Sequence, residues 1–167
     1  MNAQVEQRIS SAETIIEQLH QCAAQVLCDF PVDIAYLYGS VANKRPLINT
    51  SDIDIAIVLA DQTRSPYAQL MLETEIQAAL EDACQLSQID VRTINQAPIT
   101  VQGPIVQEGI LLYSREKAQR VAFEVNVRKQ YFDYLPMIER MQRAFLQHIR
   151  TKGLSHGQHK NRYVHSQ

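Results

Sequence analysis

The chain has no apolar segment long enough to cross a membrane and no marked excess of either charge. Its apolar runs stay well short of the ~20 residues that a membrane-spanning helix needs. The formal net charge is -2 at pH 7, so a general attraction to nucleic acid is not expected. Polar residues follow Met1, so no secretory signal peptide is expected. These absences predict a cytoplasmic protein with no membrane contact and no direct nucleic-acid partner.

Cysteine is also scarce. The chain has 3 cysteines, Cys22, Cys28 and Cys84, which lack the paired spacing of zinc sites. We expect them to be reduced, partly buried thiols. The 167 residues, 46% hydrophobic and 20% charged, are typical of one soluble globular domain. We expect that domain over residues 1–150. Residues 151–167 are basic and poor in apolar groups, which predicts a disordered tail.

Hydrophobic periodicity divides the chain into helices and strands. Apolar residues at steps of three and four predict helices over residues 2–28, 65–84, 98–106 and 115–150. Runs rich in β-branched residues predict strands over residues 32–38, 53–59, 88–94 and 110–113. The expected inner face of the second helix consists of Tyr67, Leu70, Met71, Ile76 and Leu80. This order predicts an α+β fold, in which helices flank a small mixed β-sheet over residues 30–114 and the terminal helices are long.

Chemistry-bearing residues lie around the turn between the first two predicted strands. Gly39-Ser40 ends the first apolar run, and Asp52-Ile53-Asp54 opens the second. Side chains alternate along a strand, so Asp52 and Asp54 face the same way. Adjacent carboxylates repel one another unless a cation neutralises them, and Mg²⁺ prefers such ligands together with substrate phosphates. Gly39 permits close approach to the backbone, and Ser40 offers a hydroxyl and an N–H to a phosphate.

A third acid supports this interpretation. Asp90 lies in the third predicted strand, which could pair beside the second and bring its carboxylate next to the other two. Asp-x-Asp alone is a weak signal, because chance often produces it. The order of strand, Gly-Ser, polar turn and paired acids is more specific. The pattern predicts a nucleoside triphosphate site.

The last predicted helix carries a near-heptad apolar stripe. Its members are Phe123, Val127, Tyr131, Tyr134, Ile138, Met141 and Phe145. The stripe either packs on its own domain or docks onto another protein, since a large exposed apolar patch marks an interface. Pro136 lies within the pattern and is expected to kink the helix or split it.

The motif resembles that of a known family. Gly39-Ser40-Val41-Ala42 followed by Ser51-Asp52-Ile53-Asp54 is similar to the signature of polymerase β-type nucleotidyltransferases. Within them the chain is most similar to minimal nucleotidyltransferase (MNT) proteins, the MntA-type antitoxins that are paired with HEPN ribonuclease toxins. The resemblance covers residues 30–145 and includes Asp90. Asn43-Lys44 stands where the family usually has Arg-Gly.

The resemblance implies an enzyme of the polymerase β-like nucleotidyltransferase fold that transfers AMP from ATP to a tyrosine of a HEPN toxin. Asp52, Asp54 and Asp90 would hold two Mg²⁺ ions and perform the catalysis. Gly39 and Ser40 would bind the triphosphate, with Lys44 or Arg45 supplying positive charge. The partner would be a HEPN-family toxin in a hetero-oligomer, and the expected docking residues are Tyr131, Tyr134, Ile138 and Met141.

Two other functions stay open. The chain could be a non-catalytic antitoxin that acts by complex formation alone, although binding alone would not require three acids. It could also be a small-molecule nucleotidyltransferase of the aminoglycoside-modifying type. That activity would need an acid-lined cleft for a polycation, whereas the C-terminal helix has more apolar than acidic residues.

Overall fold

Four strands form one mixed sheet in the order β3-β2-β1-β4. The computed structural model describes residues 3–43, 52–61 and 63–152. β1 pairs antiparallel with β2 and with β4, whereas β2 and β3 run parallel. The strands are β1 (Val32–Tyr38), β2 (Ile53–Leu59), β3 (Ile89–Thr93) and β4 (Ile110–Ser114). The helices are α1 (Ala3–Leu27), α2 (Gly39–Ala42), α3 (Pro66–Cys84), α4 (Ile99–Glu108) and α5 (Lys117–Lys152).

The predicted α+β fold with a mixed sheet is confirmed, and each predicted strand and helix is present. The short helix α2 was not predicted, because its four residues are too few to show a period. Pro136 lies inside α5 without splitting it. The described part of the chain divides into two compact units, the first ending at Tyr131 and the second beginning at Phe132, and α5 belongs to both. The predicted tail lies, from residue 153 on, outside the described residues. No helix in the described part of the chain has the length and apolarity that a membrane span requires.

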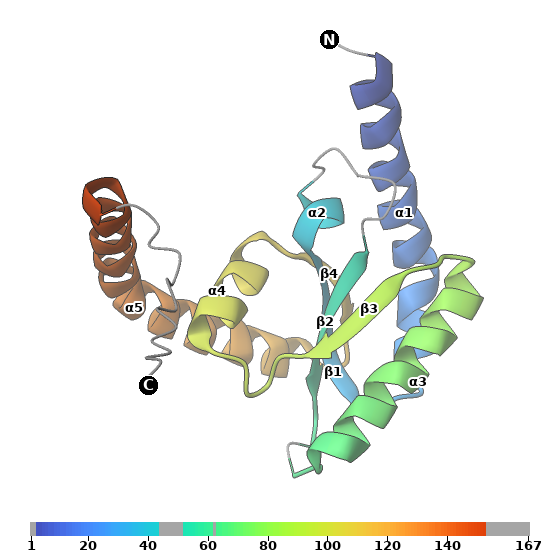
Figure 1. Cartoon of the computed structure of the whole chain (residues 1–167). Helices are drawn as coiled ribbons and strands as arrows, with labels where there is room; N and C mark the ends of the chain where they lie inside the picture. Colours follow the sequence, from blue (N-terminus) through green and yellow to red (C-terminus); the bar gives the residue numbers. More distant parts are fainter. Residues whose placement is uncertain (1–2, 44–51, 62, 153–167) are drawn as a thin grey trace, which may run out of the picture. The chain divides into compact units, whose positions relative to one another are not determined.

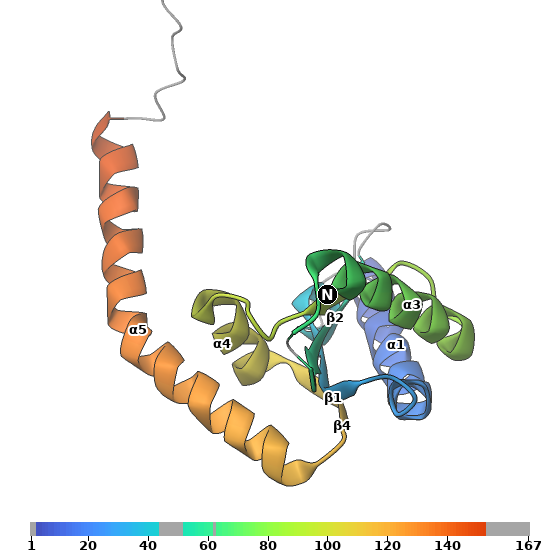
Figure 2. The same cartoon turned by 90° about the horizontal axis from the view of Figure 1, so that it is seen from below.

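Both faces of the sheet are apolar, so each needs a cover. On one face, Leu37, Ile55 and Val91 pack with buried residues of α1 and α3. On the other face, Tyr36 and Ala56 pack with Ile105 of α4 and with Phe123 at the start of α5. Figures 1 and 2 show α1 and α3 on one side of the strands and α4 on the other. The second face is the one that carries the predicted acids.

The inner face of α3 differs from the prediction. Ile76 and Leu80 are buried as expected, and Leu72 joins them. Tyr67, Leu70 and Met71 are exposed instead, with Tyr67 73% accessible. The prediction was wrong because apolar residues lie on more than one side of the first turns, and spacing alone does not show which side faces the sheet.

A buried carboxylate attaches the start of α5 to β1. The Tyr36 hydroxyl donates a hydrogen bond to Glu124 Oε1 over 2.9 Å, and Arg120 Nη1 donates to the same oxygen over 2.8 Å. Arg128 Nη1 reaches Glu124 Oε2 at 3.4 Å and donates through Nη2 to the Val106 carbonyl of α4. Burial disfavours the charged carboxylate, but the bonds from Arg120 and Tyr36 outweigh it and lower the pKa of Glu124.

Two of the cysteines are joined, which corrects the expectation of reduced thiols. Cys22 of α1 and Cys84 at the end of α3 form a disulfide, with Cα atoms 5.5 Å apart. Cys28 is free and exposed. The two cysteines are 62 residues apart in the sequence, so no local pattern predicts the bridge. Its formation depends on how α1 and α3 pack. The bridge closes a long loop that contains β1, β2 and most of α3.

Replacement of the bridge by Cys22→Ala/Cys84→Ala is expected to lower the free energy of unfolding by about 2–4 kcal/mol, because the unfolded chain regains the entropy of a long loop. Urea unfolding of both proteins measures the difference. Cys28→Ala is the matched control and should change the unfolding free energy by less than about 0.5 kcal/mol. Equal midpoints for the double variant and this control would contradict a stabilising bridge.

Glu124→Gln is expected to cost about 1–3 kcal/mol of stability at pH 7, since Arg120 and Arg128 lose a charged acceptor. The folded pKa of Glu124 lies below its ordinary value. Its stabilisation is therefore complete above about pH 4.3 and is lost as the pH falls through the lower folded pKa. Urea unfolding across this range should show the variant and the parent converging in acid. The exposed Glu139→Gln should change little at any pH; a constant gap for Glu124→Gln would contradict the ionic role.

Candidate functional site

Three neighbouring strands place a tyrosine and two acids in one row. Tyr38 of β1 is the register partner of Asp54 in β2, and Asp54 is the partner of Asp90 in β3. Directly paired residues point to the same side of a sheet. The parallel pairing of β2 with β3 thus brings together two of the three predicted acids, as the sequence suggested. Asp54 and Asp90 are half-buried, and Asp52 is exposed just before β2.

Gly39 is required where β1 turns into α2. Its φ is +74°, in the left-handed region that side chains disfavour. A Cβ at this position would overlap the Asp54 carboxylate. Ser40 follows directly and is half-buried. The Asn43 side-chain amide and backbone N–H both donate to the Gly39 carbonyl. The missing Cβ of Gly39 therefore makes room for the Asp54 carboxylate itself, and the close approach of a ligand to this backbone stays a prediction. Lys44 and Arg45, the predicted sources of positive charge, lie outside the described residues.

Burial and neighbouring negative charge together shift the pKa values of Asp54 and Tyr38. Burial raises the pKa of Asp54, and the negative charges of Asp90 and Asp52 raise it further. Burial also raises the pKa of Tyr38, with Asp54 and Asp90 adding to the effect. Each of these two groups is harder to ionise, first because it is partly buried and then because its neighbours are negative. Such an accumulation of like charge favours the binding of a cation.

Arg92 is the positive group nearest to Asp90 in the described part of the site. Its Nε lies 3.0 Å from Asp90 Oδ1 and 3.1 Å from Oδ2. No role was predicted for Arg92 or for Tyr38. Arg92 could have been found from the period of two, because it shares a strand face with Asp90. Tyr38 could have been found from its position at the end of β1, next to Gly39.

The donor set fits Mg²⁺, which usually takes one or two carboxylates and completes its shell with phosphates and waters. Asp54 and Asp90 are adjacent by register, and the missing Cβ of Gly39 makes room for the Asp54 carboxylate. Within the described residues, however, no group of three or more His, Cys, Asp or Glu side chains converges closely enough to hold an ion. The three-carboxylate arrangement with Asp52 therefore remains a prediction.

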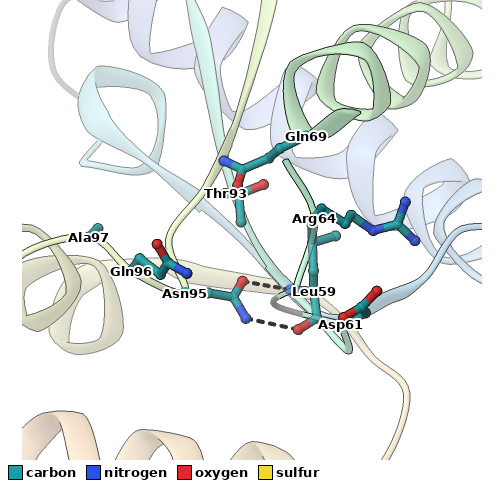
Figure 3. A pocket seen from close by; sticks show the side chains of 8 residues that line it. All are labelled: Leu59, Asp61, Arg64, Gln69, Thr93, Asn95, Gln96 and Ala97. Carbon is teal, nitrogen blue, oxygen red and sulfur yellow. Dashed lines mark hydrogen bonds between the residues drawn. The ribbon is translucent and has the colours of Figure 1, made fainter. Parts of the chain in front are cut away.

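Two hollows lie at opposite ends of the sheet. A small one of about 100 Å³ adjoins Tyr38 and Gly39 and is closed by Pro104, Ile105 and Glu108 of α4. A polar one of about 280 Å³ lies beyond the far ends of β2 and β3 (Figure 3). There the Asn95 amide exchanges two hydrogen bonds of 2.8 Å with the backbone of Leu59. Asn95 thus continues the β2–β3 pairing, and this pocket is distant from the acids.

The predicted docking residues on α5 differ in exposure. Tyr131 is half-buried, and its ring fills the space that a Cβ on Gly103 of α4 would need. In the second unit, Tyr134 is 48% and Met141 64% exposed, while Ile138 is partly exposed. Tyr131 therefore packs within its own unit, whereas the later part of the stripe faces outward.

The fold is shared with solved structures. A chain of a toxin–antitoxin complex crystallised with AMP-PNP is 23% identical, with a TM-score of 0.53 over 78% of this chain and 98% of that chain. Chains from two mutants of the MntA–HpeT toxin–antitoxin complex are 22% and 23% identical. Each has a TM-score of 0.52 over 71% of this chain and 93% of its own. No curated protein matches the chain.

The sequence itself identifies the family. The family model described as polymerase β nucleotidyltransferase matches residues 17–118. This match is longer than half of the chain and contains β1 to β4, Gly39-Ser40 and all three acids. The protein therefore belongs to the polymerase β nucleotidyltransferase family.

Proposed function

We propose that this chain is the antitoxin of a HEPN–MNT pair and that it transfers AMP from ATP to a tyrosine of its HEPN toxin in the cytoplasm. The observation that carries the proposal is the pairing of Asp54 with Asp90 beside Gly39. Membership of a nucleotidyltransferase family supports the reaction type. The similarity in fold to chains of toxin–antitoxin complexes, one of them with AMP-PNP, supports the choice of partner and nucleotide.

The predicted site residues have separate roles in this reaction. Asp52, Asp54 and Asp90 would hold two Mg²⁺ ions, while Gly39 and Ser40 receive the triphosphate with help from Lys44 or Arg45. Bound Mg²⁺ supplies charge neutralisation for the triphosphate and for the attacking oxygen. Asp90 accepts the proton of the toxin tyrosine as its oxygen attacks the α-phosphorus and pyrophosphate leaves. Positioning and charge account for most of the rate in such transfers.

The acceptor is proposed to be a protein, because the C-terminal helix carries more apolar than acidic residues, whereas a polycationic small molecule would need an acid-lined cleft. The second unit is a helix with exposed apolar residues, Tyr134, Met141 and Phe145. Such residues are typical anchors of protein interfaces. We propose that this end of α5 binds the toxin and thereby presents its tyrosine. Complex formation and AMP transfer would then both contribute to inhibition of the toxin.

Transfer is tested by the intact mass of the protein encoded next to this chain, the proposed toxin, after incubation with the chain, Mg²⁺ and ATP. We expect a gain of one or more AMP units. Asp54→Asn should slow the transfer by at least about 1,000-fold, because a charged ligand is lost from the site. Asp61→Asn removes an exposed carboxylate beyond the other end of β2 and should leave the rate within about twofold.

A stable complex with no gain of mass would contradict the transfer and support the non-catalytic antitoxin. Neither complex nor gain of mass would contradict both and support a small-molecule acceptor. The fold of each variant is checked by its urea midpoint, so a lost rate in a folded Asp54→Asn protein is attributable to the site.

Ile138→Glu is expected to weaken toxin binding by at least about tenfold, since it places a charge among apolar anchors. Isothermal titration of the toxin measures the change. Gln147→Glu is the matched control, because nine residues along a helix correspond to the opposite side. It introduces the same residue and should leave the affinity within about twofold. Unchanged affinity for Ile138→Glu would show that the toxin binds elsewhere.

A further inference from the structure

We propose that Arg92 is a built-in competitor of the metal ion at Asp90, so that the site takes up its second cation only when the guanidinium is displaced. This inference rests on the proposed role of Asp90 as a metal ligand. It assigns to Arg92 a positioning role that the nucleotide-transfer reaction itself does not require.

The geometry places the guanidinium on the oxygens that an ion would use. Asp90 and Arg92 are two residues apart in β3 and therefore lie on the same strand face. Arg92 Nε lies within 3.1 Å of both Asp90 oxygens. A cation cannot bind an oxygen on this side while the guanidinium stays in place, and the positive charge repels a divalent ion at the same distance.

The ion pair between Asp90 and Arg92 can open at low cost. The two side chains are 56% and 36% exposed, so water screens their attraction and solvates the released guanidinium. An exposed ion pair of this kind costs little to open. A more buried pair, such as Glu124 with Arg120, would instead be costly to break.

A nucleotide would favour the exchange. An arriving triphosphate brings negative oxygens that a guanidinium binds well, and so it offers Arg92 a second acceptor as the ion takes Asp90. Metal uptake at Asp90 is therefore weak in the absence of nucleotide. This arrangement keeps the repelling acids neutralised in the resting protein by one of its own residues.

The test measures Mn²⁺ binding to the full chain in the absence of ATP and toxin, by the loss of the free Mn²⁺ signal in electron paramagnetic resonance. Arg92→Gln is expected to bind Mn²⁺ roughly two- to fivefold more tightly than the parent, the gain expected from removal of an exposed pair. Arg92→Ala should repeat this gain. Arg92→Lys, which keeps the charge, should stay close to the parent.

Two controls distinguish loss of the Asp90–Arg92 ion pair from the loss of one positive charge elsewhere on the protein. Arg64→Gln removes the same charge from the loop after β2, near the far end of the sheet, and should change the affinity less than Arg92→Gln. In an Asp90→Asn background, Arg92→Gln should give no gain beyond that of Arg64→Gln. A gain that persists without Asp90, an unchanged affinity in Arg92→Gln and Arg92→Ala, or no Mn²⁺ binding by any of these proteins would each overturn the proposal.

These measurements contain no nucleotide and no toxin. A failure of AMP transfer would therefore leave the Mn²⁺ result standing, and a failure of the Mn²⁺ result would leave the transfer assay untouched.

Discussion

The parallel register of β2 and β3 holds two carboxylates side by side, and much of the structure is arranged around that constraint. Asp54 and Asp90 are direct partners, and Asp52 adds negative charge nearby. A folded chain accepts such repulsion only if other contacts outweigh it. The adjoining residues of both strands supply those contacts, because Ile53, Ile55 and Val91 are buried against α1 and α3 on the opposite face. Apolar packing on one face thus stabilises charge on the other.

The same division of the two faces explains the other special positions. Gly39 has no side chain because Asp54 occupies the space that a Cβ would take. α4 and the start of α5 cover the apolar part of the second face, and the buried Glu124 network secures α5 to Tyr36. Beside the row formed by Tyr38, Asp54 and Asp90, β3 is an edge strand.

The parts of this arrangement that repeat along the chain were predictable from the sequence. A period of two put Asp52 and Asp54 on one face, and a β-branched run marked β2 as a buried strand. Pairing of Asp90 with Asp54 was a guess about which strands are neighbours, and the register confirms it. Contacts between distant segments were not predictable. The Cys22–Cys84 bridge, the outward face of Tyr67 and the attachment of Glu124 to Tyr36 all depend on how helices pack.

Arg92 shows why a site cannot be inferred from its acids alone. The sequence places it on the face of Asp90, but only the structure shows its guanidinium against both carboxylate oxygens. A site that must attract divalent ions and a polyanion in turn faces opposite electrostatic demands. Acids alone would bind metal readily but repel the triphosphate, whereas a fixed cation would do the reverse. In the proposed role, the exposed guanidinium beside the acids satisfies both demands, because it neutralises them at rest and pairs with phosphate once metal has taken its place.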